Sequence, residues 1–289
     1  MLLDADEMNG LAPLRLRLWM RPRSQSPSEF SSHDKGMGLE FADYQPFQPG
    51  DDIRHVDWNH FHKDGRLVVR KYDQHESVAI HLMVDLSASM TCLDAQRPLA
   101  VKRLCAALAF CLLQNGAKAV LHPVGHPSLR RPFSGAVQWE ACHAAIEDLP
   151  VGGTLTLVEE VRQFCYARPR RDHLVVLSDF LTDHEPAGIV GPLADLGLRT
   201  ALIHPVSAAE LEPPLEGGLT LVEAEAVRRQ ASLTVDRHVI AEYQRAYRQY
   251  YEDLRRDAEQ YACRFLEVDC DAPLHSQMES LAPDGVLTL

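Results

Sequence analysis

From residue 78 onward the chain alternates between short apolar runs and longer helix-forming stretches, and this alternation limits its fold more than any other feature. Helices that separate buried apolar strands place those strands side by side in a parallel sheet. The pattern predicts strands at 78–84, 119–124, 173–178, 199–205 and 263–268, and helices at 98–115, 136–149, 155–167, 187–196 and 237–260. We therefore expect an α/β fold with a doubly wound, mostly parallel sheet.

Two stretches depart from the strict alternation. VLHPVGHPSLRRPF at 120–133 reads as a strand, a turn and a second strand, which predicts one antiparallel edge strand. PPLEGGLTLVEAE at 213–225 and ASLTVD at 231–236 predict two extra short strands before the helix 237–260. The helix at 98–115 is apolar almost all round, so we expect it to be heavily buried.

The residues before 77 have a different composition. LRLRLWMRPR runs into SQSPSEFSSHDKG, which predicts a basic arm and a Ser/Pro linker over residues 1–35. Residues 36–76 contain the turn dipeptides Pro49-Gly50 and Asp64-Gly65 and a strand near 67–72, so we expect a small β-containing segment. Residues 77–289 form the α/β domain.

Charge and cysteine content narrow the classes of protein. A formal net charge of −12 argues against nucleic-acid binding, which needs clustered Lys and Arg. The 7 cysteines are scattered and mostly lie in apolar helical stretches, as reduced thiols do in a cytosolic protein. The acidic start does not resemble a secretory signal, and the longest apolar run, 104–113, is about half the ~20 residues of a membrane span. These features predict a cytoplasmic protein with no transmembrane segment.

Acids and hydroxyls follow two of the predicted strands. VDLSASM places Asp85, Ser87 and Ser89 directly after the first strand, and Asp179 follows the strand that ends at Ser178. Functional groups in doubly wound sheets gather beyond the carboxyl ends of the strands, where the strand order reverses. If the two strands are neighbours there, both carboxylates and the hydroxyls face one crevice.

A third segment, GGTLTLVEE at 152–160, adds another hydroxyl. Thr156 and Glu159 form a capping box, which leaves Thr154 free behind two glycines that permit a tight backbone approach. Carboxylate and hydroxyl oxygens are hard ligands that suit Mg²⁺, or Mn²⁺. An ion held by only two carboxylates, some acting through water, keeps an open position for an acidic side chain of another molecule.

The set Asp85, Ser87, Ser89, Thr154 and Asp179 resembles the metal-ion-dependent adhesion site of von Willebrand factor A domains. The resemblance implies that the serines and the threonine contact the ion directly and that the acids bind it directly or through water. It also implies a von Willebrand factor A-like sheet with one antiparallel edge strand. A metal site that forms a nucleophile would add a histidine or further carboxylates, so we expect a protein without enzymatic activity.

The upstream part carries a narrower resemblance. The stretches GMGLEFADYQPFQPGDDIRHVDW at 36–58 and LVVRKYDQHES at 67–77 resemble the bacterial DUF58 family, including Tyr44, Asp57-Trp58 and Arg70. The likeness spans about residues 36–289. It implies a partnership with a MoxR-type AAA+ ATPase, in which the chain is an adaptor of a chaperone-like or assembly system. The partner would supply the acidic ligand of the metal.

Other interpretations stay open. The acids and hydroxyls of the loop after the first strand could serve solely as hydrogen-bond partners of nearby backbone groups. Alternatively, the same crevice could be the active site of a metal-dependent phosphoesterase. The basic arm could make a peripheral membrane contact. His55, His60 and His62 fit loop or edge-strand positions better than a zinc site, and Asp51-Asp52 fits a turn better than an acid/base pair. The tyrosine stripe at 243–251 indicates a core face, with Arg245, Arg248, Arg255 and Arg256 on the solvated side.

Overall fold

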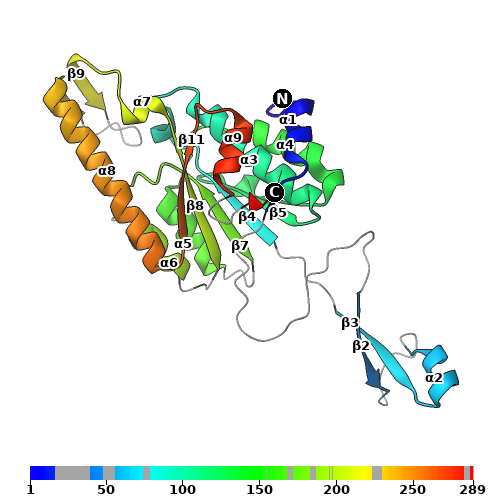
Figure 1. Cartoon of the computed structure of the whole chain (residues 1–289). Helices are drawn as coiled ribbons and strands as arrows, with labels where there is room; N and C mark the ends of the chain where they lie inside the picture. The colour runs from blue at the N-terminus through cyan, green and yellow to red at the C-terminus, as the bar shows by residue number, and fades with distance from the viewer. Residues whose placement is uncertain are drawn as a thin grey trace. The chain divides into compact units, whose positions relative to one another are not determined.

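The chain divides into two compact units. The computed structural model describes residues 1–16, 40–47, 56–73, 79–153, 155–167, 172–182, 187–194, 196, 198–222, 230–282 and 287–288. One unit, called the α/β unit below, consists of Met1–Arg21 and Val78–Leu289 (Figure 1). The other, called the small unit, consists of Pro22–Ser77.

The α/β unit is built on a six-stranded sheet in the order β11-β8-β7-β4-β5-β6. Its strands are β4 (Ala79–Val84), β5 (Lys118–Pro123), β6 (Arg131–Ser134), β7 (His173–Leu177), β8 (Arg199–Val206) and β11 (Arg264–Asp269). Neighbouring strands run parallel, except that β6 pairs antiparallel with β5 at the edge. The expected doubly wound, mostly parallel sheet with one antiparallel edge strand is confirmed.

Strand β4 is the point where the strand order reverses. The chain leaves β4 toward β5 on one side of it and later returns to β7 and β8 on the other side. Such a reversal opens a crevice beyond the carboxyl ends of the strands. The register of β4 and β7 ends with Val84 opposite Leu177, so the loops that follow the two strands begin side by side.

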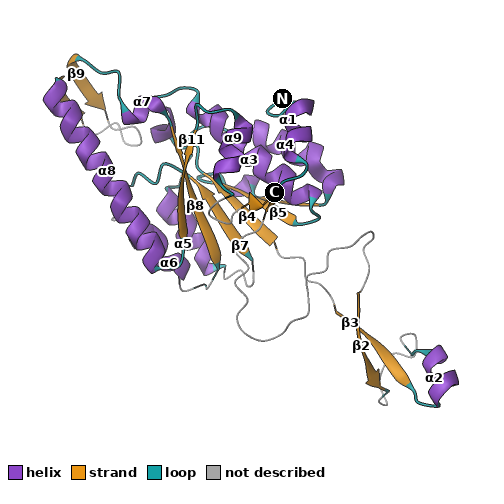
Figure 2. Cartoon of the chain, in the orientation of Figure 1, coloured by secondary structure: helices purple, strands orange, loops and turns teal. Residues whose placement is uncertain are grey.

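Helices cover both faces of the sheet (Figure 2). The elements on one face are α1 (Ala5–Leu11), α3 (Arg97–Gln114), α4 (Trp139–Glu147) and α9 (Leu274–Ser280), and those on the other are α5 (Leu157–Tyr166), α6 (Ala187–Ala194) and α8 (Arg237–Gln260). The side chains of Leu82 and Val84 enter the first core and that of Met83 the second, as the two-residue period of a strand requires. Helix α3 is buried along most of its length, as expected. In the described part of the chain, no helix has both the length and the apolar character needed to cross a membrane.

The first residues of the chain pack into the core beside α3, which differs from the arm expected over residues 1–35. Three leucines there are at most 2% exposed: Leu3, Leu11 and Leu14. Strand β1 (Arg15–Leu16) then pairs antiparallel with β12 (Leu287–Thr288). The apolar surface that these leucines bury stabilises a packed segment, whereas the basic composition alone predicts an arm. Residues 17–35 of the arm and linker lie outside the described residues.

The packing of this segment can be tested by truncating a leucine. Leu3→Ala should lower the free energy of unfolding by roughly 2–5 kcal/mol, because it leaves a cavity in the core. Urea denaturation followed by circular dichroism measures this. Leu99→Ala is the control, since Leu99 on α3 is 48% exposed and should lose much less. Equal effects of the two substitutions would mean that the first residues are not packed.

The small unit contains a two-stranded antiparallel sheet and one described helix. The sheet consists of β2 (Glu40–Pro46) and β3 (Val68–Asp73), and its register shifts between Phe41 and Asp43. The strand expected near 67–72 is therefore present as β3. The helix is α2 (Trp58–Asp64), which follows the buried residue Asp57.

Two of the histidines considered for zinc lie on this helix. His60 and His62 are helical, not in a loop or an edge strand as expected. The physical reason is a local cap, because the carboxylate of Asp57 accepts the amide of His60 at 3.1 Å and favours a helical turn there. His55 and the pair Asp51-Asp52 lie outside the described residues.

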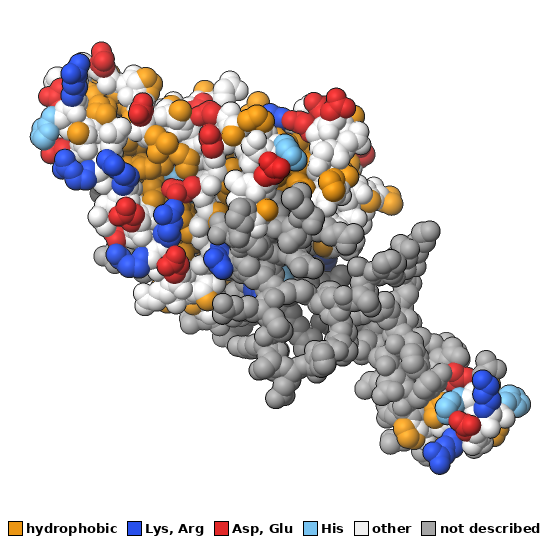
Figure 3. Space-filling view, viewed as in Figure 1, with side chains coloured by type: hydrophobic (Ala, Val, Ile, Leu, Met, Phe, Trp, Pro, Cys, Tyr) orange, Lys and Arg blue, Asp and Glu red, His pale blue; other side chains and the backbone are white. Residues whose placement is uncertain are grey.

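The predicted detour before the long helix is also present. Strands β9 (Gly217–Val222) and β10 (Gln230–Val235) form an antiparallel pair that follows the short helix α7 (Ala208–Leu211). Helix α8 then covers the predicted residues 237–260. Its tyrosines Tyr247, Tyr250 and Tyr251 face the core, while its arginines lie exposed among acidic side chains on the outer face (Figure 3). Both expectations for this helix are confirmed.

Candidate metal site

The predicted acids and serines lie together at the strand-order reversal of the sheet. Asp85 follows β4 directly, Ser87 and Ser89 lie in the next turn, and Asp179 follows β7 after one residue. Because β4 and β7 are hydrogen-bonded neighbours, these loops start at the same edge of the sheet. Thr154, the remaining predicted ligand, lies outside the described residues.

The carboxylate of Asp85 fastens the two loops to each other. Its Oδ1 accepts the amide of Ser87 at 2.9 Å, and its Oδ2 accepts the hydroxyl of Ser178 at 2.6 Å. The amide of Asp85 also donates to the carbonyl of Leu177 at 2.8 Å. Asp85 is only 4% exposed, so these bonds lie in a desolvated setting where they are strong.

The serines present a pair of oxygens beside this carboxylate. The hydroxyls of Ser87 and Ser89 hydrogen-bond to each other at 2.9 Å, and both side chains are half-buried. Ser89 lies in a short 3₁₀ turn (Ala88–Thr91). Since each hydroxyl oxygen has two lone pairs, the pair can still donate electrons to a cation.

Asp179 has a carboxylate oxygen that the described protein groups leave without a partner. Its Oδ1 accepts the amide of Leu181 at 3.0 Å, but its Oδ2 is buried and has no hydrogen-bond partner among the described residues. The residue is 1% exposed. A buried carboxylate oxygen without a partner is costly, so its presence calls for an explanation.

Electrostatics make the same carboxylate reluctant to ionise. Burial, followed by the negative charge of Asp85, raises the pKa of Asp179 to about 7. The guanidinium of Arg97, the amide of Leu181 and the hydroxyl of Ser89 act in the opposite direction. A divalent cation between the two acids would stabilise the ionised carboxylate and so offset both causes of the increase.

The loop that leads to Thr154 is fixed against the same turn. The amide of Gly152 donates to the carbonyl of Leu86 at 2.7 Å, and Nε2 of His126 is 2.7 Å from the carbonyl oxygen of Gly152. A Cβ atom on Gly153 would lie 2.8 Å from Cα of Gly125, so only glycine fits there. Beyond this loop, Thr156 and Glu159 form the expected capping box of α5.

Turn hydrogen bonds explain some of these residues but not all of them. Asp85 uses both carboxylate oxygens to hold the loops, which is a structural role. Oδ2 of Asp179 has no such role among the described residues. The residues present therefore fit a cation bound by hard oxygens, although the described residues contain no group of three or more His, Cys, Asp or Glu side chains that could hold a metal.

Several residues that shape the site were not singled out from the sequence. Ser178 bonds to Asp85, and Arg97 lies close enough to act on Asp179 while its Nε donates to the carbonyl of Pro205 at 3.0 Å. Arg97 is 4% exposed and forms an ion pair with Glu210 at 3.1 Å. Arg97 lies beside Pro98 at the start of α3, where the sequence indicates only the beginning of a helix. No local sequence pattern therefore predicts its contacts with Glu210 and Pro205.

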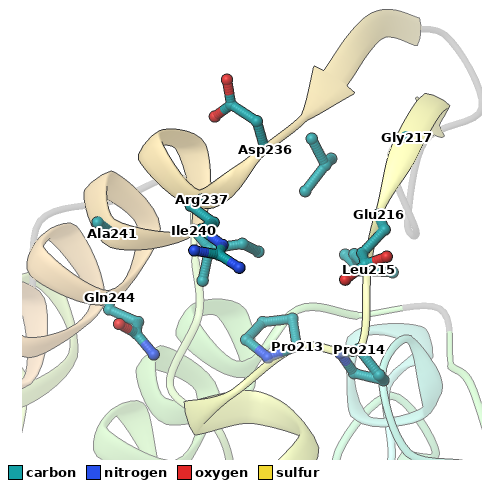
Figure 4. Close-up of a pocket in the computed structure, with 11 residues that line it drawn as sticks. Pro213, Pro214, Leu215, Glu216, Gly217, Asp236, Arg237, Ile240, Ala241 and Gln244 are labelled. Atoms are coloured by element: carbon teal, nitrogen blue, oxygen red, sulfur yellow. The ribbon is translucent and has the colours of Figure 1, made fainter.

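A separate cavity of about 880 Å³ lies at the beginning of α8 (Figure 4). It is lined by Pro213, Pro214, Leu215, Glu216, Gly217, Val235, Asp236, Arg237, Ile240, Ala241 and Gln244. Asp236 caps the helix by accepting the amides of His238 and Val239, each at 2.9 Å. None of the predicted metal ligands that the structure describes lines this cavity, so it is distinct from the part of the candidate metal site that is described.

The fold and the site together define a doubly wound α/β protein with acids and hydroxyls at its strand-order reversal. The chain belongs to the DUF58 family, described as protein of unknown function, whose model matches residues 43–253. A comparison with curated proteins finds no match.

Several solved structures give distant likenesses. The chain is similar to proximal thread matrix protein 1 from the mussel byssus, with 11% identity, 73% of this chain and 46% of that chain covered, and a TM-score of 0.40. It is similar to the pilus adhesin SpaC from Lactobacillus rhamnosus GG in its open conformation, with 12% identity, coverage of 74% and 30%, and a TM-score of 0.41. An uncharacterised membrane spanning protein from Vibrio fischeri gives 12% identity, coverage of 71% and 98%, and a TM-score of 0.20. The chain spans less than half of the first two proteins, and likenesses this weak support no conclusion on function.

The raised pKa of Asp179 predicts that neutralising this residue has a pH-dependent effect on stability. Asp179→Asn should raise the melting temperature of the metal-free protein at pH 8, where the buried wild-type carboxylate is ionised at a cost. The gain in melting temperature should shrink as the pH falls toward 4. Because the pKa of Asp179 is higher in the folded protein than in the unfolded chain, ionised Asp179 lowers stability only as the pH rises above its unfolded-state pKa. Thermal denaturation in a chelator across this pH range measures it.

Asp236→Asn serves as the control for this experiment. The amides of α8 lower the pKa of Asp236, so neutralising that acid should bring no gain at pH 8. A lower melting temperature for Asp179→Asn than for the wild type at every pH would contradict the electrostatic account.

Proposed function

We propose that this protein is a non-enzymatic interaction module that binds Mg²⁺, or Mn²⁺, and uses it to capture an acidic residue of a partner protein. The ion would be held by Asp85, Ser87, Ser89, Thr154 and Asp179, as in a metal-ion-dependent adhesion site. The observation that carries the proposal is Oδ2 of Asp179, which is buried and has no hydrogen-bond partner among the described residues, at the end of the strands that also presents Asp85 and the two serines.

The oxygen ligands of this site would leave a bound cation with an incomplete coordination shell. Both oxygens of Asp85 already accept hydrogen bonds, so part of its charge is used within the protein. The serine hydroxyls are neutral donors. A hard cation held this way keeps affinity for a further carboxylate, which a partner protein can supply. The role of the ion would be to bridge two proteins.

The arrangement of the sheet supports a von Willebrand factor A-like assignment for residues 77–289. Its strand order places β4 in the centre, and its single antiparallel strand lies at the edge. The DUF58 membership supports the further proposal that the partner is a MoxR-type AAA+ ATPase and that the chain is an adaptor of a chaperone-like or assembly system.

A metal-dependent phosphoesterase in the same crevice is the alternative. It would need a cationic side chain that faces the incoming phosphate. Arg97 acts on Asp179, but its guanidinium is buried and engaged by Glu210 and the carbonyl of Pro205. It is therefore not offered to a substrate, and no observation on the described residues favours the phosphoesterase.

A calorimetric titration of Mg²⁺ tests the metal site. The wild type should bind the ion, and Asp85→Ala should bind it at least about tenfold more weakly, since loss of even an outer-shell partner typically costs ~10–100-fold. Asp94→Ala is the matched control, because Asp94 lies on the same connection and accepts the amide of Gln96 at 2.8 Å. Equal binding by wild type and Asp85→Ala would count against the site.

A pull-down tests the partner. Wild-type protein with Mg²⁺ should retain a MoxR-type AAA+ ATPase, and a chelator or the Asp85→Ala substitution should release it, because the ion forms the bridge. Mass spectrometry of the eluate identifies the retained protein, and Asp94→Ala again provides the control. Retention that is unchanged by the chelator would exclude a metal bridge.

A further inference from the structure

Two adjacent tyrosines of α8 hold the turn that carries Asp179. The hydroxyl of Tyr251 donates to the carbonyl of Asp179 at 2.7 Å, and that of Tyr250 donates to the carbonyl of Phe180 at 2.6 Å. Phe180 is fully buried and has a φ of 56°, a conformation that non-glycine residues rarely adopt. Such a residue persists only where its surroundings fix it, and the tyrosines are part of those surroundings.

Tyr251 is itself locked in place. Its ring stacks on that of His204, with centroids 4.1 Å apart and an angle of 18° between the planes, and it is 3% exposed. His204 is fully buried, and its Nε2 lies 3.3 Å from the guanidinium of Arg97 and 3.5 Å from Glu210. The tyrosine therefore rests on a buried ionic cluster at the end of β8, which fixes the position of its ring.

Helix α8 is tied to the same region by further contacts. The hydroxyl of Tyr243 donates to the carbonyl of Glu210 at 3.0 Å, and the side-chain amide of Gln244 donates to the carbonyl of Leu211 at 3.0 Å. The helix therefore contacts both α7 and the Asp179 turn. Its first two turns form one side of the 880 Å³ cavity, where Arg237 and Gln244 lie opposite the Pro213–Pro214 segment (Figure 4).

We propose that Tyr250 and Tyr251 are positioning residues of the metal site and that the position of α8 sets its cation affinity. The hydroxyls hold two successive carbonyls, those of Asp179 and Phe180, directly after the Asp179 side chain, so a displaced α8 would misplace the second acid. By linkage, cation binding would stabilise the seated helix to the same extent. This inference rests on the proposed function, because it assumes that Asp179 is a ligand, and it adds an element through which that site can be regulated.

Removing single hydroxyls tests the proposal. Tyr251→Phe should weaken Mg²⁺ binding by roughly three- to tenfold, the range expected for the loss of one buried hydrogen bond. Tyr247→Phe is the matched control, since the Tyr247 hydroxyl is buried and has no hydrogen-bond partner in the part of the chain that the structure describes, and its ring centroid lies 4.6 Å from that of Tyr251. The control should bind Mg²⁺ as the wild type does. Tyr250→Phe provides a second test if Tyr251→Phe does not fold.

A measurement without metal separates this inference from the proposed function. In metal-free protein, the amides of Phe180 and Leu181 should exchange with solvent faster in Tyr251→Phe than in Tyr247→Phe, because the turn is released. Equal exchange in the two variants overturns the positioning role, whatever the wild type binds. Equal Mg²⁺ affinity of the two variants, with a wild type that binds, overturns it while leaving the proposed function intact. A wild type that binds no Mg²⁺ overturns the proposed function and the affinity claim together.

Discussion

The pairing of β4 with β7 is the constraint on which the candidate site depends. The backbone bond from Asp85 to Leu177 and the side-chain bond from Ser178 to Asp85 join the ends of two strands that lie far apart in the sequence. Asp179 is the next residue after Ser178, so this junction brings two carboxylates into one desolvated place. Their mutual repulsion is the feature that a cation would relieve.

Much of the fold could be predicted because its signals are local. The buried strands are mostly apolar stretches, and α8 is marked by the Asp236 cap and an amphipathic pattern. The edge strand β6 was predictable because a short turn with Gly125 and Pro127 separates it from β5. Asp85, Ser87, Ser89 and Asp179 could be selected because residues after strand ends meet at one edge of a parallel sheet.

Other features depend on contacts that no local pattern encodes. Arg97 reads as the start of a helix, yet its guanidinium reaches Glu210 and the end of β8. The tyrosines of α8 read as a core stripe, and their hydroxyl bonds to the Asp179 turn follow only from how the helix packs. The first residues look like a basic arm by composition, but they find an apolar surface on α3 that only the folded chain provides. The burial of a few leucines holds these first residues in the α/β unit.

The pairing of β1 with β12 has a consequence for how the α/β unit is made. A ribosome would release residues 1–16 long before α3, α9 and β12, the elements on which they rest. The small unit, Pro22–Ser77, is synthesised in between. The opening segment must therefore wait, with its leucines open to chaperones, until late-synthesised elements complete its docking site.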